Sequence, residues 1–278
     1  MGRGVSFSSR RRRGGAGPRA PVALQLRAPG RLPRRAAQAG EAALRHILAL
    51  DLDLRPFYEM ARGDPHLAPL VERFHGLRPV RYLSVFEALV TAITTQQVNL
   101  TFGGIIRARM VGRWGERLVI GGQTHFAFPR PERLVRARPE TLRGLQFSAR
   151  KAEYVIGVAV ASADGALDAE ALRRLPLEEA IGRLTALRGV GRWTAEQALF
   201  RGLGRVEAFA GGDLGVQKVV ARYCLGRAWA EERRVRGRAE RWAPWGGLAT
   251  TYLFAAWRAG IPPARRGRAA ASGGERGR

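Results

Sequence analysis

The stretch LRGVG at residues 187–191 places Gly189 and Gly191 between two helix-forming runs. Both glycines allow a tight turn, because glycine tolerates positive φ and the close approach of other groups. A helix that begins near Arg192 would direct its free N–H groups and the positive end of its dipole beyond the turn, which suits a phosphate. Arg192 and Thr194 are placed to add side-chain contacts. The same pattern is also typical of an ordinary helix–helix connection that uses glycine as a stop signal.

A single aspartate, Asp213, comes 22 positions after Gly191 and directly after Gly211 and Gly212. The run LGVQKVVARY that follows it predicts a helix, so the aspartate is well placed as an N-cap. A capping carboxylate is held rigid and ionised. The capping role is therefore compatible with a chemical one.

The charge of the chain indicates its class of partner. There are 48 Lys and Arg against 23 Asp and Glu, a formal net charge of +25, and the only lysines are Lys151 and Lys218. Such an excess favours a polyanion, because each contacted phosphate releases condensed counterions. A GC-rich genome would also explain arginine in place of lysine, but it does not explain the shortage of acids. We expect nucleic acid as the partner.

Other residue types exclude several kinds of site. The single cysteine, Cys224, excludes an intrachain disulfide and a cysteine-ligated iron–sulfur or zinc site. The four histidines lie far apart and form no ligand pattern. No apolar run approaches the roughly 18 residues of a membrane span, and the N-terminus lacks the apolar stretch of a secretory signal. We expect a protein of the cytoplasm, associated with the nucleoid.

Helical signals follow one another along the middle of the chain. Ser84 and Glu87 stand in capping-box spacing, Ser148 precedes a helical-period run, and Pro176 begins the run that leads into the hairpin. Further helices are predicted over 192–203, 214–225, 231–241 and 247–258. Strand alternation is hard to find after residue 40. We predict an all-α bundle of about ten short helices, with a helix-hairpin-helix at about 178–203.

Both ends of the chain have the composition of tails. Residues 1–40 carry ten arginines and no acid, and residues 265–278 are rich in Arg, Gly and Ala. Like-charge, glycine-rich segments repel themselves and stay solvated. We predict flexible basic tails over both ranges, the first largely disordered, around a helical domain at 41–264. VALQL at 22–26 is suited to a short strand, and residues 117–129 are the least regular part of the domain.

The hairpin and its surroundings resemble the helix-hairpin-helix superfamily of DNA glycosylases. In that superfamily the hairpin reads roughly L-P-G-V/I-G, and an aspartate follows about twenty residues later. FEALVTAITTQQVNL (86–100), KAEYVIGVA (151–159) and RWAPWGGLATTYLFAAW (241–257) look like its other segments, so the resemblance covers roughly residues 55–260. The sequence GVGRWTAE is similar to the 3-methyladenine DNA glycosylase II branch.

This resemblance implies a monofunctional DNA glycosylase that flips out and hydrolytically excises alkylated purines such as 3-methyladenine. Bifunctional members carry a Schiff-base lysine where this chain has Trp193, and neither lysine of the chain lies in the hairpin, so no lyase activity is expected. Asp213 would stabilise the oxocarbenium-like sugar as the base departs. Two alternatives stay open: a non-catalytic helix-hairpin-helix DNA-binding protein, and a glycosylase for deaminated or oxidised bases.

The resemblance also assigns residues to the damaged base. Trp193 and Phe254, and more weakly Tyr252, would line a pocket whose ring faces attract a cationic purine. Plain core packing is the alternative for each of these side chains, and for Tyr252 and Trp257 it is the preferred interpretation. Gln97, with Gln96 beside it, would fill the gap that a flipped base leaves; both also fit a polar helix end facing solvent.

Finally, the hairpins of this superfamily often hold a monovalent cation through backbone carbonyls, which here would be those of Thr185, Leu187 and Val190. A structural Na⁺ or K⁺ is the candidate there; no required cofactor, no iron–sulfur cluster and no zinc is expected. The expected partner is double-stranded DNA with a damaged base, with no membrane, bound by a monomer.

Overall fold

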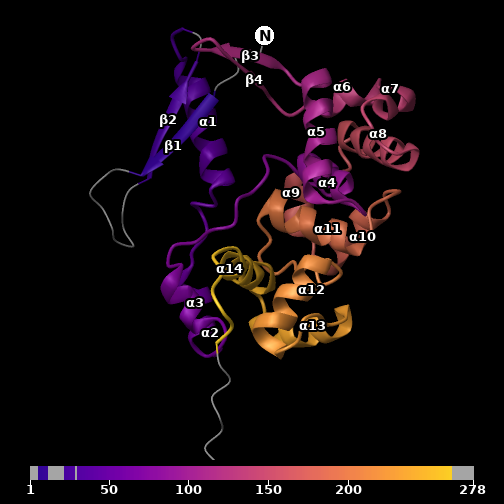
Figure 1. The fold of residues 1–278 in the computed structure, drawn as a ribbon. Coiled ribbons are helices and arrows are strands. Elements are labelled where there is room, and N and C mark those ends of the chain that lie inside the picture. Colours follow the sequence, from indigo (N-terminus) through magenta and orange to yellow (C-terminus); the bar gives the residue numbers. More distant parts are fainter. Residues whose placement is uncertain (1–5, 12–21, 29, 265–278) are drawn as a thin grey trace, which may run out of the picture.

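The computed structural model describes residues 6–11, 22–28 and 30–264, and within them the chain is mostly helical (Figure 1). The helices are α1 (Arg34–Ile47), α2 (Arg55–Arg62), α3 (Ala68–Arg73), α4 (Val85–Thr95), α5 (Leu100–Trp114), α6 (Pro131–Val135), α7 (Pro139–Gly144), α8 (Ala149–Ala163), α9 (Ala169–Arg174), α10 (Leu177–Thr185), α11 (Arg192–Ala198), α12 (Leu214–Val220), α13 (Glu232–Ala239) and α14 (Gly246–Arg258). Antiparallel hairpins pair β1 (Ser6–Arg11) with β2 (Val22–Arg27), and β3 (Arg117–Ile120) with β4 (Gln123–Phe126). Ten of the described helices have seven residues or more, which confirms the predicted bundle.

The buried side chains form two clusters. The first cluster lies among α4 to α11 and is centred on residues such as Leu89 and Ile93. The second cluster lies among α2, α3 and α12 to α14, around residues such as Phe57. The chain passes from the first cluster to the second between Ala208 and Phe209. Asp213 therefore lies in a loop that begins at the junction of the two clusters.

The N-cap residues predicted from the sequence lie at the starts of α4, α8 and α10, the helices around the turn between α10 and α11. Ser84 accepts the backbone N–H of Glu87 at 3.1 Å and caps α4, and the Glu87 carboxylate accepts the N–H of Leu83, one residue before the cap, at 3.2 Å. Ser148 accepts the N–H of Lys151 at 3.3 Å and caps α8. Pro176 is the N-cap residue of α10. These predicted helix starts are confirmed.

Two of the predicted helices end in a wider turn. The segment 192–203 consists of α11 followed by a π-helical turn at Leu199–Leu203, and 214–225 consists of α12 followed by one at Ala221–Leu225. Each π-turn stops at a left-handed glycine, Gly204 with φ 77° and Gly226 with φ 65°. Glycine ends a helix this way because it lacks the Cβ that makes left-handed backbone costly.

The N-terminal region differs from the flexible tail predicted over residues 1–40. In its described part β1 pairs with β2, and α1 begins at Arg34, before the predicted boundary. The side chain of Leu26 lies against Gly40 of α1, where a Cβ would stand 3.0 Å from a Leu26 methyl carbon. The short strand for which VALQL is suited is therefore present as β2, and its Leu26 makes this contact. The predicted tail at 265–278 lies outside the described residues.

A second difference is the hairpin at 117–126, where the sequence shows no strand alternation. Its residues are half-buried or exposed, so neither face needs an apolar stripe. The turn at Gly121 and Gly122, with φ values of 56° and 77°, suits a two-residue hairpin, which is a signal that periodicity misses. Across the parts of the chain described, none of the helices is both long enough and apolar enough to span a bilayer.

Candidate functional site

Two glycines in the turn between α10 and α11 have different roles, one in the backbone conformation and one in the accessibility of the turn. Gly189 has a φ of +86°, and a Cβ there would overlap the ring of Tyr154 on α8. Gly191 is the N-cap residue of α11 with a φ of −82°, and a Cβ there would meet nothing within 4 Å. Backbone conformation and packing thus require glycine at position 189. At position 191 glycine has no side chain to cover the start of α11, which therefore stays accessible.

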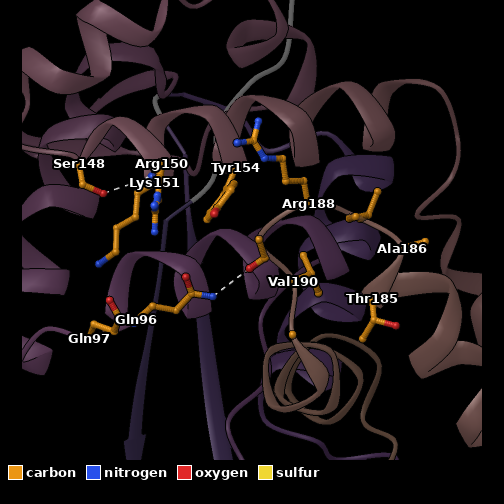
Figure 2. Close-up of a pocket in the computed structure, with 13 residues that line it drawn as sticks. Gln96, Gln97, Ser148, Arg150, Lys151, Tyr154, Thr185, Ala186, Arg188 and Val190 are labelled. Carbon is orange, nitrogen blue, oxygen red and sulfur yellow. Dashed lines mark hydrogen bonds between the residues drawn. The ribbon is translucent and has the colours of Figure 1, made fainter.

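A hollow of ≈ 530 Å³ lies between this turn, the end of α4 and the start of α8 (Figure 2). Its lining includes three basic residues, Arg150, Lys151 and Arg188, and no acidic one. Arg188 pairs with Glu153 at 3.1 Å, whereas the ammonium of Lys151 donates to the carbonyl oxygen of Thr94 at 3.0 Å. Burial lowers the pKa of Lys151. The hollow therefore offers positive charge beside the hairpin backbone, which suits an anion.

The two glutamines at the end of α4 have different environments. The side-chain nitrogen of Gln96 donates to the Gly189 carbonyl oxygen at 3.0 Å and lies 3.2 Å from Oγ1 of Thr194. Gln97 is exposed and has a left-handed backbone with a φ of 53°. Gln96 therefore braces the hairpin from within, which differs from the predicted contact with DNA. Gln97 is the more exposed of the two, and its insertion into a duplex stays a prediction.

The structure brings Asp213, Phe254 and Trp193 together. Asp213 caps α12, since its Oδ1 accepts the N–H of Val216 at 3.0 Å, so the predicted N-cap is confirmed. A Cβ built on Gly215 would stand 2.9 Å from Oδ1 of Asp213 and 3.3 Å from Cζ of Phe254. A Cβ built on Gly212 would stand 3.3 Å from Cβ of Trp193. The half-buried carboxylate thus lies near the half-buried ring of Phe254, and the residue before it, Gly212, packs against the half-buried Trp193.

Tyr252 does not belong to this group, and its assignment to the base pocket is corrected. Its side chain is fully buried in the second cluster, with its ring 5.0 Å from that of Phe57. Its hydroxyl donates to the Leu77 carbonyl oxygen at 3.1 Å, and burial raises its pKa. Trp257 is the reverse case: it is 44% exposed and stacks on Phe254 with ring centres 6.2 Å apart. Helical spacing alone does not reveal which face of α14 is covered.

Of the two phosphate contacts predicted after the turn, the one by Thr194 is corrected, and the one by Arg192 stays a prediction. Arg192 donates to Glu178 at 2.6 and 2.9 Å and to Glu196 at 3.0 Å, so its charge is already paired. The hydrogen bond with Glu178 is the main cause of its raised pKa. Thr194 is fully buried and cannot reach a phosphate. Within this turn the sequence did not distinguish the covered Thr194 from the exposed Arg192. Arg150 and Lys151, which line the hollow, were not predicted.

The carbonyls proposed for a monovalent cation lie at the same hollow, which Thr185, Leu187 and Val190 all line. The Leu187 oxygen accepts the N–H of Val190 at 3.0 Å, and a carbonyl oxygen has a second lone pair for a ligand. In the described portion of the chain, no three His, Cys, Asp or Glu residues gather as metal ligands would.

Comparison with known proteins identifies what this arrangement is similar to. Residues 90–244 match the profile of the HhH-GPD superfamily base excision DNA repair proteins. A DNA-3-methyladenine glycosylase of Bacillus subtilis is 34% identical over 206 residues, which are 74% of this chain and 68% of the relative. The structure of a 3-methyladenine DNA-glycosylase from Archaeoglobus fulgidus matches with a TM-score of 0.78 and 29% identity, over 92% of this chain and 84% of that one.

A third match is to a complex with DNA. The Schizosaccharomyces pombe 3-methyladenine DNA glycosylase bound to abasic DNA has a TM-score of 0.60 and 26% identity, over 73% of this chain and 97% of that one.

Proposed function

Because this chain belongs to the HhH-GPD superfamily of base excision DNA repair proteins, we propose that it is a monofunctional DNA glycosylase that excises alkylated purines such as 3-methyladenine. The observation that carries the proposal is the half-buried carboxylate of Asp213 near Phe254, on a loop whose Gly212 packs against Trp193 of the hairpin helix. A protein that only binds DNA has no need of a carboxylate next to an aromatic slot. That alternative, and a preference for deaminated or oxidised bases, are therefore the less favoured ones.

The proposed chemistry needs one fixed negative charge. When the C1′–N bond breaks, the sugar becomes cationic, and a carboxylate held near C1′ stabilises it or orients the attacking water. At about 4 Å and an effective dielectric of about 20, this attraction is worth roughly 4 kcal/mol. That energy corresponds to about a thousandfold in rate. The hydrogen bond from Val216 keeps the Asp213 carboxylate in one orientation for this role.

The departing base accounts for the aromatic neighbours. A purine alkylated at N3 or N7 is cationic, so a ring face attracts it by stacking and by a cation–π contact. Phe254, with Trp257 stacked behind it, and Trp193 provide such faces. Trp193 has no amine to form an imine with the sugar, so the product would be an intact abasic strand.

The DNA backbone would bind at the hollow beside the hairpin. Its basic lining and the open backbone at Gly191 suit a phosphate, and Gln97 would enter the duplex where the base has left. A Na⁺ or K⁺ held by the carbonyls of Thr185, Leu187 and Val190 would add positive charge at this place. We place the protein as a monomer in the cytoplasm, on the nucleoid.

A single-turnover excision assay tests the function. Duplex DNA with one 3-methyladenine analogue or hypoxanthine is incubated with the wild type and with Asp213→Asn, and strand breaks are scored before and after alkali. Asparagine also caps helices, so the variant should fold and bind DNA but lose about a thousandfold in rate. Asp168→Asn is the matched control, because Asp168 caps α9 through the N–H of Ala171 at 2.7 Å.

Four results would count against the proposal. Near-normal excision by Asp213→Asn would remove the aspartate from the mechanism. Breaks before alkali would mean lyase activity. Tight binding with no release of any lesion would favour the non-catalytic DNA-binding protein, and release of hypoxanthine alone would favour the deaminated-base alternative.

A further inference from the structure

The position of Asp213 relative to the hairpin depends on contacts that cross the junction of the two clusters. The loop that carries the aspartate starts at Phe209, the first residue of the second cluster, whereas α11 packs in the first cluster. The contact of Gly212 with Trp193 crosses the junction, but it is apolar and has no fixed direction. A directional link is needed to hold the loop in one place.

Arg236 of α13 makes such a link. Its guanidinium forms a two-pronged pair with Glu196 of α11, with Nη1 2.9 Å from Oε1 and Nη2 3.0 Å from Oε2. Nη1 also donates to the backbone oxygen of Phe209 at 3.0 Å. Glu232, one turn earlier on α13, lies 2.7 Å from Nη2. The guanidinium thus contacts α11 and the Asp213 loop at the same time, and its planar fork fixes the angle between them.

The loop fits closely around this side chain. A Cβ on Gly211 would stand 2.9 Å from Cγ of Arg236, so glycine lets the backbone approach the stem. From the other side, the side-chain nitrogen of Gln217 donates to the Gly211 carbonyl oxygen at 3.1 Å. Two carbonyls of the loop, those of Phe209 and Gly211, are therefore held by side chains of α13 and α12.

Glu196 is 1% exposed, so removing its carboxylate from water costs free energy that the ion pair must offset. Replacing a buried ion pair with apolar residues is often neutral or stabilising, so stability alone does not account for it. Glu196 also accepts from Arg192, the first residue of α11. One buried carboxylate therefore joins the start of the hairpin helix to the loop of the aspartate.

We propose that Arg236, acting through Glu196, is a positioning residue that holds Asp213 at a fixed place relative to the hairpin. The expected effect of Arg236 on excision rests on the proposed function. Its expected effect on the position of the Asp213 loop does not depend on that function. Displacing a reacting group by about 1 Å can cost on the order of a hundredfold in rate. Loss of the link should therefore slow excision and leave DNA binding intact.

The test compares Arg236→Met with Arg234→Met in the full chain. Arg234 is on the same helix, is exposed and has no ion pair among the described residues. Three quantities are measured: hydrogen exchange of the amides at 210–216, the single-turnover excision rate, and the affinity for DNA. Arg236→Met should speed exchange at these amides, Val216 included, and lower the excision rate by roughly 10- to 100-fold, with DNA affinity within about twofold.

Two further variants keep the test informative if Arg236→Met unfolds. Arg236→Lys keeps the charge but loses the fork, and should recover part of the rate. The double variant Glu196→Gln/Arg236→Met removes both charges and leaves neither buried alone. Its loss of rate should be about that of one single variant, since residues of one network are not additive.

The inference is overturned by unchanged exchange at 210–216, or by DNA affinity falling in proportion to the excision rate. A wild type that excises nothing while Arg236→Met still loosens the loop would reject the proposed function and keep the link. A wild type that excises normally, with no effect of Arg236→Met, would reject the link alone.

Discussion

The side-chain amide of Gln96 donates a hydrogen bond to the carbonyl oxygen of Gly189, 3.0 Å away, and so ties the end of α4 to the hairpin turn. The next residue, Gln97, is exposed and has a left-handed backbone. Two adjacent residues of one type therefore differ in task. The first stabilises the turn, and the second is the residue that we propose enters the duplex.

Substitution of these glutamines should separate the two tasks. Gln97→Ala should lower excision from duplex DNA by roughly tenfold, since the gap left by a flipped base is no longer filled, while stability stays within about 0.5 kcal/mol. Gln96→Ala should cost about 1 kcal/mol of unfolding free energy through its lost hydrogen bonds. Urea unfolding and excision kinetics measure both. The reverse pattern would show that Gln96 is the wedge.

Gly189→Ala and Gly191→Ala form a matched pair in the turn. Alanine at 189 must adopt a left-handed backbone, which costs about 1–2 kcal/mol, and must also displace the Tyr154 ring. We expect a loss of 2 kcal/mol or more, with weaker DNA binding. At 191 the backbone and the open space accept alanine, so the loss should stay below about 1 kcal/mol. Thermal unfolding with a DNA titration checks this; equal losses at both positions would contradict it.

Tyr252 and Phe254, two residues apart on α14, should respond in opposite ways. Tyr252→Phe loses the hydrogen bond to the Leu77 carbonyl and should cost about 1 kcal/mol of stability, with excision unchanged. Phe254→Ala should slow the excision of a cationic purine by roughly tenfold, because a cation–π contact worth about 1–2 kcal/mol is lost. Slower excision by Tyr252→Phe would return that residue to the pocket.

The salt dependence of DNA binding should distinguish paired from unpaired arginines. Each phosphate contact contributes about 0.9 to the slope of log K against log salt concentration. Arg150 lines the hollow, is exposed and has no ion pair among the described residues, so Arg150→Gln should flatten the slope by about that amount. Arg192→Gln should change it by less than about half as much, because Glu178 and Glu196 already hold Arg192. A larger effect at Arg192 would show that DNA displaces these carboxylates.

A buried aspartate in the second cluster should make stability depend on pH. Burial of Asp64 raises its pKa, but hydrogen bonds from Arg238, Trp242 and the N–H of His66 outweigh it, and the net shift is downward. A carboxyl with a lower pKa in the folded state stabilises the fold above its unfolded pKa and loses that effect as the pH falls through the folded value.

Asp64→Asn should therefore cost about 3 kcal/mol near neutral pH, where it leaves Arg238 buried without its partner. The difference from the wild type should shrink below about pH 4. Urea unfolding across this range measures it. A difference that stays constant with pH would mean that the carboxylate charge contributes nothing.

Local signals in the sequence predicted the helical bundle and the turn between α10 and α11. Caps such as Ser84 and Ser148 act through neighbouring backbone groups, so a few residues suffice to identify them. The resemblance assigned Asp213, Phe254 and Trp193 to one site; Asp213 lies near Phe254, and Gly212 of the same loop packs against Trp193. What the sequence could not supply was the direction of side chains after the turn. Thr194 and Tyr252 lie on faces that tertiary packing covers, and helical periodicity is the same for a covered face and an open one.

The sequence also did not predict which residues far apart in the chain would form hydrogen bonds or ion pairs. The bond between Gln96 and Gly189 joins residues 93 positions apart, and the one between Arg236 and Glu196 spans 40. An arginine-rich chain offers many equivalent partners for each acid, so composition does not select the pair that forms. The hairpin of β3 and β4 was missed because its exposed strands carry no apolar stripe.

The two separate hydrophobic clusters have a consequence for how such an enzyme could change. The hairpin packs in the first cluster, whereas Asp213 and Phe254 are attached to the second. Substitutions on α12 and α14 can then reshape the space around the base without disturbing the packing under the hairpin. A new lesion preference could be selected in one half of the molecule while the other continues to hold undamaged and damaged DNA alike.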